Sequence, residues 1–163
     1  MSTYRRILLK LSGEILSSDD QNISPKMLNK VVNIVHSALN MGVEVAIVIG
    51  GGNIFRGVNL ANAGMNRVTG DHIGMLATVM NALAISDAFV RHNIPCQVMS
   101  GLPIGGGVCD SVDHNKAKNA LSQGKVVIIL ILIRVYLLDL FVILDYLHYF
   151  QLLSLIKQIF IIS

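Results

Sequence analysis

Residues 48–57 read VIGGGNIFRG, and this stretch decides the fold class. It continues an apolar run, Val43 to Ile49, that is typical of a short strand buried in a parallel sheet. The three glycines that follow, Gly50 to Gly52, carry no Cβ that could block a bound nucleotide. Arg56 then supplies a planar guanidinium suited to phosphate oxygens. The alternative is a flexible turn with a surface arginine, which is less favoured because three glycines cost much chain entropy.

A second strand and a helix precede this stretch. The run RRILLKL, residues 5–11, predicts another buried strand, and Ser12–Gly13 after it predicts a tight loop. Apolar residues between the two strands recur at helical spacing. Ser24 is the expected N-cap of this helix, Pro25 its first residue, and Gly42 lies just past its end. The result is a strand, helix, strand unit.

The same pattern repeats downstream. Residues 75–84 carry apolar side chains at helical spacing, and Gln97 to Ser100 read as a short strand. Asp113 is expected to cap a third helix through Leu121, with another strand from Val126 onward. Such alternation predicts an α/β three-layer sandwich with a mostly parallel sheet. Ligands of these sheets bind beyond the carboxyl ends of the strands, where both glycine-rich segments fall.

The segment Lys10 to Gly13 pairs a cation with a small residue and a glycine at the end of a strand. A phosphate needs a mobile cation and close backbone N–H groups, and this spacing supplies both. A solvated lysine before an ordinary turn is the commoner explanation of such a tetrapeptide when it stands alone. Lys10 to Gly13 therefore predict a phosphate site only together with other segments of the chain that could bind the same ligand.

Asp71 and His72 fall near the expected start of the second long helix. On the residues alone, an N-cap role is the favoured interpretation of Asp71, and a carboxylate that binds ligand hydroxyls is the alternative. His72 has no partner at metal-ligand spacing, so we expect a structural or surface histidine.

Composition excludes several function classes. The net charge is only +3, and Lys and Arg do not form a stripe with interleaved aromatics, so nucleic-acid binding is not expected. Cys96 and Cys109 lack the spacing of a zinc site and are expected to be reduced thiols. The first residues lack the long apolar region of a signal peptide, which favours a cytoplasmic protein.

Four segments carry a resemblance to a known family: RRILLKLSGE (5–14), VIGGGNIFRG (48–57), AGMNRVTGDHIGMLATVMNALA (63–84) and GVCD (107–110). In this order and spacing they resemble bacterial UMP kinase, of the amino-acid-kinase superfamily. Carbamate, acetylglutamate and aspartate kinases share the lysine-glycine opening and the triple glycine. The FRG and GMNRVTGDHIGMLAT runs resemble UMP kinase only.

The resemblance implies the amino-acid-kinase fold and in-line phosphoryl transfer from ATP, as its Mg²⁺ complex, to UMP. It implies no metal site made by the protein, a homohexamer, and GTP and UTP as effectors. Lys10 and Arg56 would stabilise the reacting phosphates, and Gly51 and Asp71 would bind UMP. The implied ATP-binding residues are Lys10, Leu11, Ser12, Gly13, Gly52 and Arg56.

The resemblance ends near Ile128, so we expect a UMP-binding part of the kinase domain in residues 1–128 and an unrelated tail in residues 129–163. All 14 glycines and all three prolines lie at or before Gly124, whereas Ile and Leu make up 19 of the 36 residues from 128 to 163. Four charged residues interrupt the tail too often for a membrane span: Arg134, Asp139, Asp145 and Lys157.

We interpret the tail as the product of a frame shift or a truncated gene, prone to aggregation. The later loop that completes the UMP site and the adenine half of the active site have no counterpart here. An impaired kinase is therefore expected. The alternatives are a non-catalytic fragment that binds UMP or forms oligomers, and a protein that associates with membranes through its tail.

Overall fold

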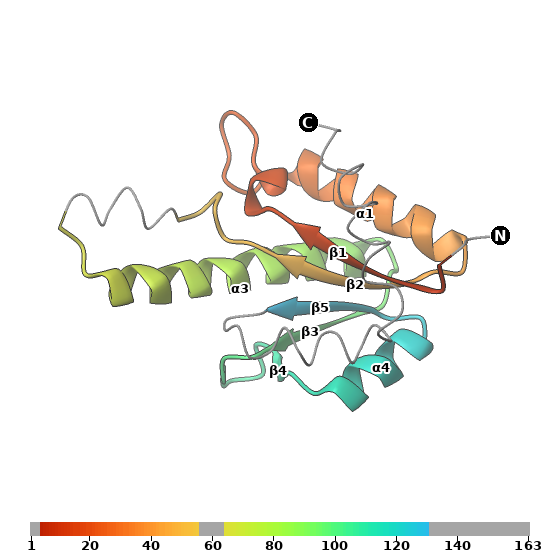
Figure 1. Cartoon of the computed structure of the whole chain (residues 1–163). Helices are drawn as coiled ribbons and strands as arrows, with labels where there is room; N and C mark the ends of the chain where they lie inside the picture. Colours follow the sequence, from red (N-terminus) through yellow and green to blue (C-terminus); the bar gives the residue numbers. More distant parts are fainter. Residues whose placement is uncertain (1–3, 56–63, 131–163) are drawn as a thin grey trace.

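The computed structural model describes residues 4–55 and 64–130, and their centre is a parallel sheet (Figure 1). The strand order in the described part is β1-β2-β5-β3-β4, and every neighbouring pair is parallel. The strands are β1 Arg6–Leu11, β2 Glu44–Ile49, β3 Cys96–Ser100, β4 Asp110–Ser111 and β5 Val126–Leu130. The α/β fold with a parallel sheet is thus confirmed.

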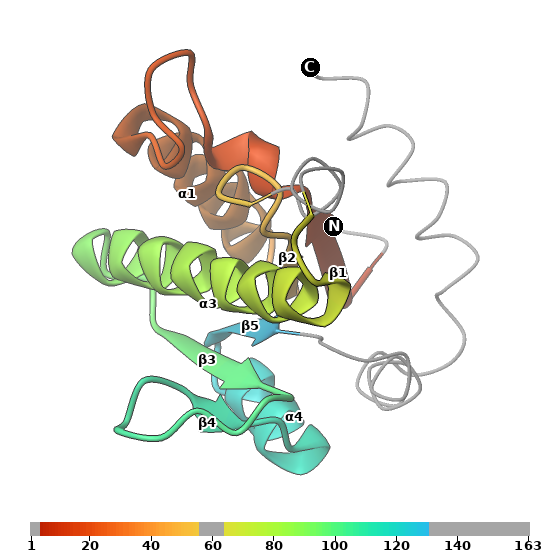
Figure 2. The ribbon, with the colours of Figure 1, turned by 90° about the vertical axis from the view of Figure 1, so that its left-hand side faces the viewer.

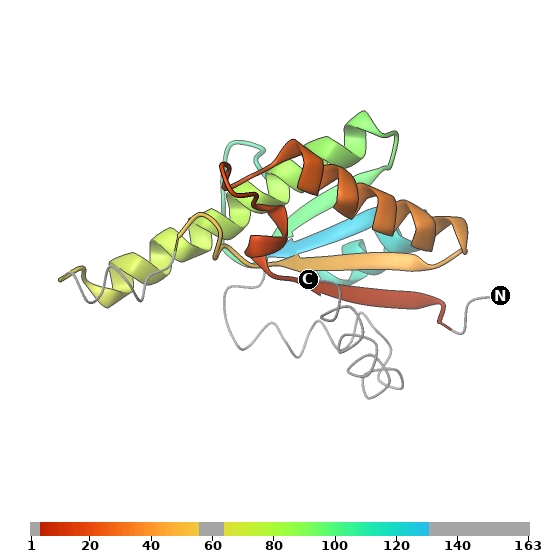
Figure 3. The same cartoon turned by 90° about the horizontal axis from the view of Figure 1, so that it is seen from above.

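Helices cover both faces of this sheet. On one face α1 (Pro25–Asn40) and α3 (Arg67–Arg91) pack side by side, as Figure 3 shows from above. On the other face α4 (His114–Ser122) packs against β2 and β5. A short 3₁₀ helix, η1 (Gly13–Leu16), follows β1 directly. The three layers were expected from the alternation of strands and helices.

The apolar core is divided between the two faces. The larger cluster joins α1 and α3 to the sheet and includes Leu9, Ile47 and Phe89. The smaller cluster lies under α4 and includes Ala117 and Ile129. All five residues of β5 are buried, as a central strand covered on both faces requires.

The predicted helix ends agree well with the structure. Pro25 begins α1 after Ser24, although the Ser24 side chain makes no capping hydrogen bond, and Gly42 follows at φ +75°. The Asp113 carboxylate accepts a 2.8 Å hydrogen bond from the Lys116 N–H and caps α4. This bond is the main reason that the pKa of Asp113 is lowered.

The expected start of the long helix is wrong. The helix begins at Arg67, because the Asn66 side chain accepts hydrogen bonds from the N–H groups of Val68 and Thr69 and so caps it. Asp71 therefore lies inside α3 and is not its N-cap. The short elements η1 and β4 were not predicted.

By length and composition alone, α3 could cross a membrane, with a mean hydropathy of 1.7 over its most apolar window. The structure buries 39% of that window, and Ile85 and Phe89 of the buried face pack on the sheet in the larger cluster. The expectations for Arg56 and for nearly all of the tail lie outside the described residues.

We predict that replacing Phe89 by Ala lowers the free energy of unfolding by about 3–5 kcal/mol, because the fully buried ring leaves a cavity in the larger cluster. Val90 is the matched control, since this next residue of α3 is 62% exposed and Val90→Ala should change stability by at most about 0.5 kcal/mol. Denaturant titration of the full chain measures both values. Equal effects of the two substitutions would contradict the position of α3.

Candidate functional site

The two glycine-rich segments lie side by side at one edge of the sheet. Because β1 and β2 are parallel neighbours with Leu11 opposite Ile49, the segments after them leave the sheet together. The Gly50 N–H donates a 3.0 Å hydrogen bond to the Leu11 carbonyl and extends the ladder by one step. Figure 2 looks onto the carboxyl ends of the strands and shows both segments above α3.

Gly13 is required by close packing of these two segments. A Cβ at Gly13 would lie 2.7 Å from the Gly50 carbonyl oxygen and 2.8 Å from the Gly52 nitrogen, and closest of all to the Asn53 side-chain oxygen. These separations are shorter than real Cβ contacts. The backbone of η1 therefore touches the loop after β2.

The three glycines of that loop have different surroundings. A Cβ at Gly51 would meet the Ala77 Cβ at 2.8 Å and the Gly74 carbonyl oxygen at 2.9 Å, because α3 lies directly against it. At Gly52 the nearest such atom is the Glu14 Oε1, at 4.0 Å. Gly51 thus serves contact with the helix, whereas Gly52 has the open side that a ligand would need.

One face of α3 borders the loop. Gly74, Ala77 and Thr78 approach Gly51, and Asp71 lies one turn before Gly74 on the same face. The Asp71 side chain is exposed. Of the two predicted UMP-binding residues, Gly51 therefore contacts α3 directly, and Asp71 lies on that helix one turn beyond the contact.

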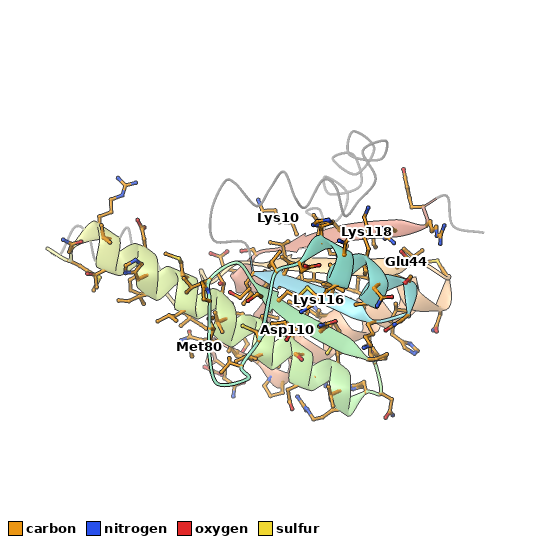
Figure 4. All side chains as sticks on the ribbon, turned by 90° about the horizontal axis from the view of Figure 1, so that it is seen from below. Lys10, Glu44, Met80, Asp110, Lys116 and Lys118 are labelled. Carbon is orange, nitrogen blue, oxygen red and sulfur yellow. The ribbon has the colours of Figure 1, made fainter. Side chains whose placement is uncertain are left out.

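Lys10 lies at the carboxyl end of β1 on the opposite face of the sheet (Figure 4). Its neighbours Leu9 and Leu11 point into the larger cluster beside α1 and α3, so the alternation of a strand directs Lys10 to the α4 side. Its side chain is exposed. Lys10 and Asp71 thus lie on opposite sides of the strand ends, with the glycine segments between them.

Sequence reasoning missed a pair of hydrogen-bonded amides beside this loop, of which Asn81 is buried and Asn53 is partly exposed. Asn81 of α3 is 0% exposed, and its side chain forms two hydrogen bonds with that of Asn53, at 2.7 and 3.0 Å. The available signal was an amide amid the apolar run from Val79 to Leu83, where only a hydrogen-bonded side chain is stable.

The site offers neither a metal cluster nor an activated thiol within the described ranges. No three His, Cys, Asp or Glu side chains there could hold a metal ion. Cys96 and Cys109 are free. Burial is the main cause of a raised pKa at Cys109, which keeps this thiol protonated near neutral pH. The arrangement suits anion binding by backbone N–H groups and a lysine.

Residues 5–135 match the model of the amino acid kinase family. This match spans most of the chain, which therefore belongs to the amino acid kinase family.

The more specific resemblance to bacterial UMP kinases is confirmed as well. The uridylate kinase of Ruthia magnifica is 65% identical over 128 residues, which are 78% of this chain and 54% of that protein. The uridylate kinase of Vesicomyosocius okutanii is 58% identical over 128 residues, again 78% of this chain and 54% of that protein. The crystal structure of UMP kinase from Bacillus anthracis superposes with a TM-score of 0.72 at 37% identity, covering 77% of this chain and 52% of that one. The chain spans about half the length of the curated relatives it matches.

We predict that Gly13→Ala destabilises the protein by about 1–3 kcal/mol, because the new methyl group must push η1 away from the Gly50–Asn53 loop. The control is Gly105→Ala, where a Cβ meets nothing within 4 Å and φ is not in the left-handed region. Denaturant titration followed by circular dichroism compares the two. Unchanged stability of Gly13→Ala would contradict the contact of the two segments.

Proposed function

We propose that this chain carries the UMP-binding half of a UMP kinase, which transfers a phosphoryl group from ATP to UMP and forms UDP. The observation that carries the proposal is the contact of the segments after β1 and β2, because it places Gly13 and Gly52 at one point beyond the strand ends. The names of the similar proteins, uridylate kinase and UMP kinase, support the choice of substrates.

In this proposal each nucleotide lies on its own side of the sheet. UMP would lie on the α3 side, between Gly51 and Asp71, whose carboxylate can accept hydrogen bonds from ligand hydroxyls. ATP would lie on the side of Lys10, with its phosphates against the segment from Leu11 and Ser12 to Gly13 and against Gly52. The reacting phosphates would then meet at the glycines.

In such a site the protein acts through position and charge. Phosphoryl transfer needs the attacking and leaving oxygens in line and cations near the transferred group, and no side-chain nucleophile. Lys10 would supply one cation, and in this proposal Arg56 supplies the second. Mg²⁺ would arrive on the phosphates of ATP as part of the substrate.

The resemblance to UMP kinases adds three further parts to the proposal. They are a cytoplasmic location, assembly into a homohexamer, and regulation by GTP and UTP. Free thiols stay reduced in the cytoplasm.

The 54% coverage of the Ruthia relative favours a second candidate function for the isolated chain. This candidate is UMP binding with little turnover, because the ATP side would need residues from the half that is not matched.

We predict that calorimetry on the full chain detects UMP binding and that Asp71→Asn weakens it about 10- to 100-fold, the usual effect of losing a charged hydrogen bond. Asp87→Asn is the matched control, since Asp87 is an exposed residue of α3 that pairs with Arg91 at 2.8 Å. It should leave the affinity unchanged.

A coupled assay of UMP-dependent ATP consumption on the same samples separates the two candidates. Normal turnover would show that this chain alone is an active UMP kinase. UMP binding with little turnover would support the second candidate, a chain that binds the acceptor nucleotide only. A folded chain that does not bind UMP would overturn both.

A further inference from the structure

Asn81 lies in the middle of α3 with no exposed surface, among residues of the larger cluster. A buried amide is tolerated only where its polar atoms find partners, because each unpaired group costs about 1–3 kcal/mol. The hydrogen-bond partners of Asn81 therefore indicate the structural role of its side chain.

All four side-chain N–H groups of the Asn53 and Asn81 pair are used. Asn81 donates to the Gly50 carbonyl at 2.7 Å and to the Asn53 Oδ1 at 2.7 Å. Asn53 donates to the Asn81 Oδ1 at 3.0 Å and to the Asn22 carbonyl at 2.6 Å. Each amide has two N–H donors, so the pair has none to spare.

These bonds join two separate segments to α3, the second of them through Asn53. They reach both ends of the loop from Gly50 to Asn53 and the segment just before α1 at Asn22. Two of the acceptors, the Gly50 carbonyl oxygen and the Asn53 Oδ1, are also atoms against which Gly13 packs. The amide pair therefore sets the separation between η1 and the triple glycine.

We propose that Asn81 and Asn53 are positioning residues for nucleotide phosphates, an inference that rests on the proposed function. A loop with three successive glycines is intrinsically flexible, and ordering it at the moment of binding would weaken affinity. The amide pair orders the loop before any ligand arrives. A nucleotide phosphate then meets a loop whose backbone is already held in place.

The test compares Asn81→Ala, Asn53→Ala and the double variant with Val79→Ala. Val79 is a buried residue of the same helix that belongs to the larger cluster and forms no part of the site, so Val79→Ala controls for lost stability. Each single asparagine substitution should weaken UMP binding about tenfold. The double variant should bind UMP no more weakly than the single variants, because either substitution alone already breaks the hydrogen-bonded pair. Val79→Ala should change the affinity less than twofold.

Hydrogen exchange in the ligand-free chain gives a second readout that needs no nucleotide. The Gly50 N–H is bonded to the Leu11 carbonyl, so its exchange reports how firmly the loop is held. In Asn81→Ala this amide should exchange at least about tenfold faster than in Val79→Ala.

The inference is overturned if Asn81→Ala matches Val79→Ala in the exchange of Gly50, or if the two asparagine substitutions reduce UMP affinity additively. Failure of the proposed function has a different signature, in which the unsubstituted chain does not bind UMP at all. The exchange experiment then still decides whether the amide pair orders the loop.

Discussion

The parallel pairing of β1 with β2 is the constraint on which the site depends. Neighbouring parallel strands must end at the same edge, so the segments that follow them are forced into contact. The contact is so close at Gly13 that no side chain fits there. A shift of one strand by a single residue would turn Lys10 toward α1 and α3 and would separate the glycines. The strand register that packs the sheet is therefore the same register that forms the site.

Much of the fold could be predicted because the local signals agree with one another. Pro25 and Gly42 bound α1, Asp113 caps α4, and the short apolar runs are strands. The start of α3 could not be placed, because Asn66 and Asp71 are both good caps and only the folded chain shows which one receives the N–H groups. Propensity cannot rank two caps separated by five residues.

The candidate site was predictable in its backbone and less so in its supporting contacts. Two glycine segments after two strands indicated convergence, and the structure shows it. The partners of Asn81 could not be read from the sequence, since Gly50 and Asn53 are separated from it by 31 and 28 residues. Long-range hydrogen bonds leave no periodic pattern. The only local sign was an amide where the helix required an apolar side chain.

The two sides of the strand ends differ in how completely the described residues build them. On the α3 side, Gly51 is wedged against Ala77, and the amide pair ties the loop to the helix. On the Lys10 side, Leu8 and Val48 are only half-buried at the edge of the smaller cluster. A rigid side suits the acceptor, whose phosphate must be held in line. The more open side is where the proposal puts ATP, and the relatives have a further half of their length that these residues do not match. In the proposal, UMP binding and phosphoryl transfer are therefore separable demands on this fold: UMP would bind on the side that the described residues build more completely, and transfer would also need the other side.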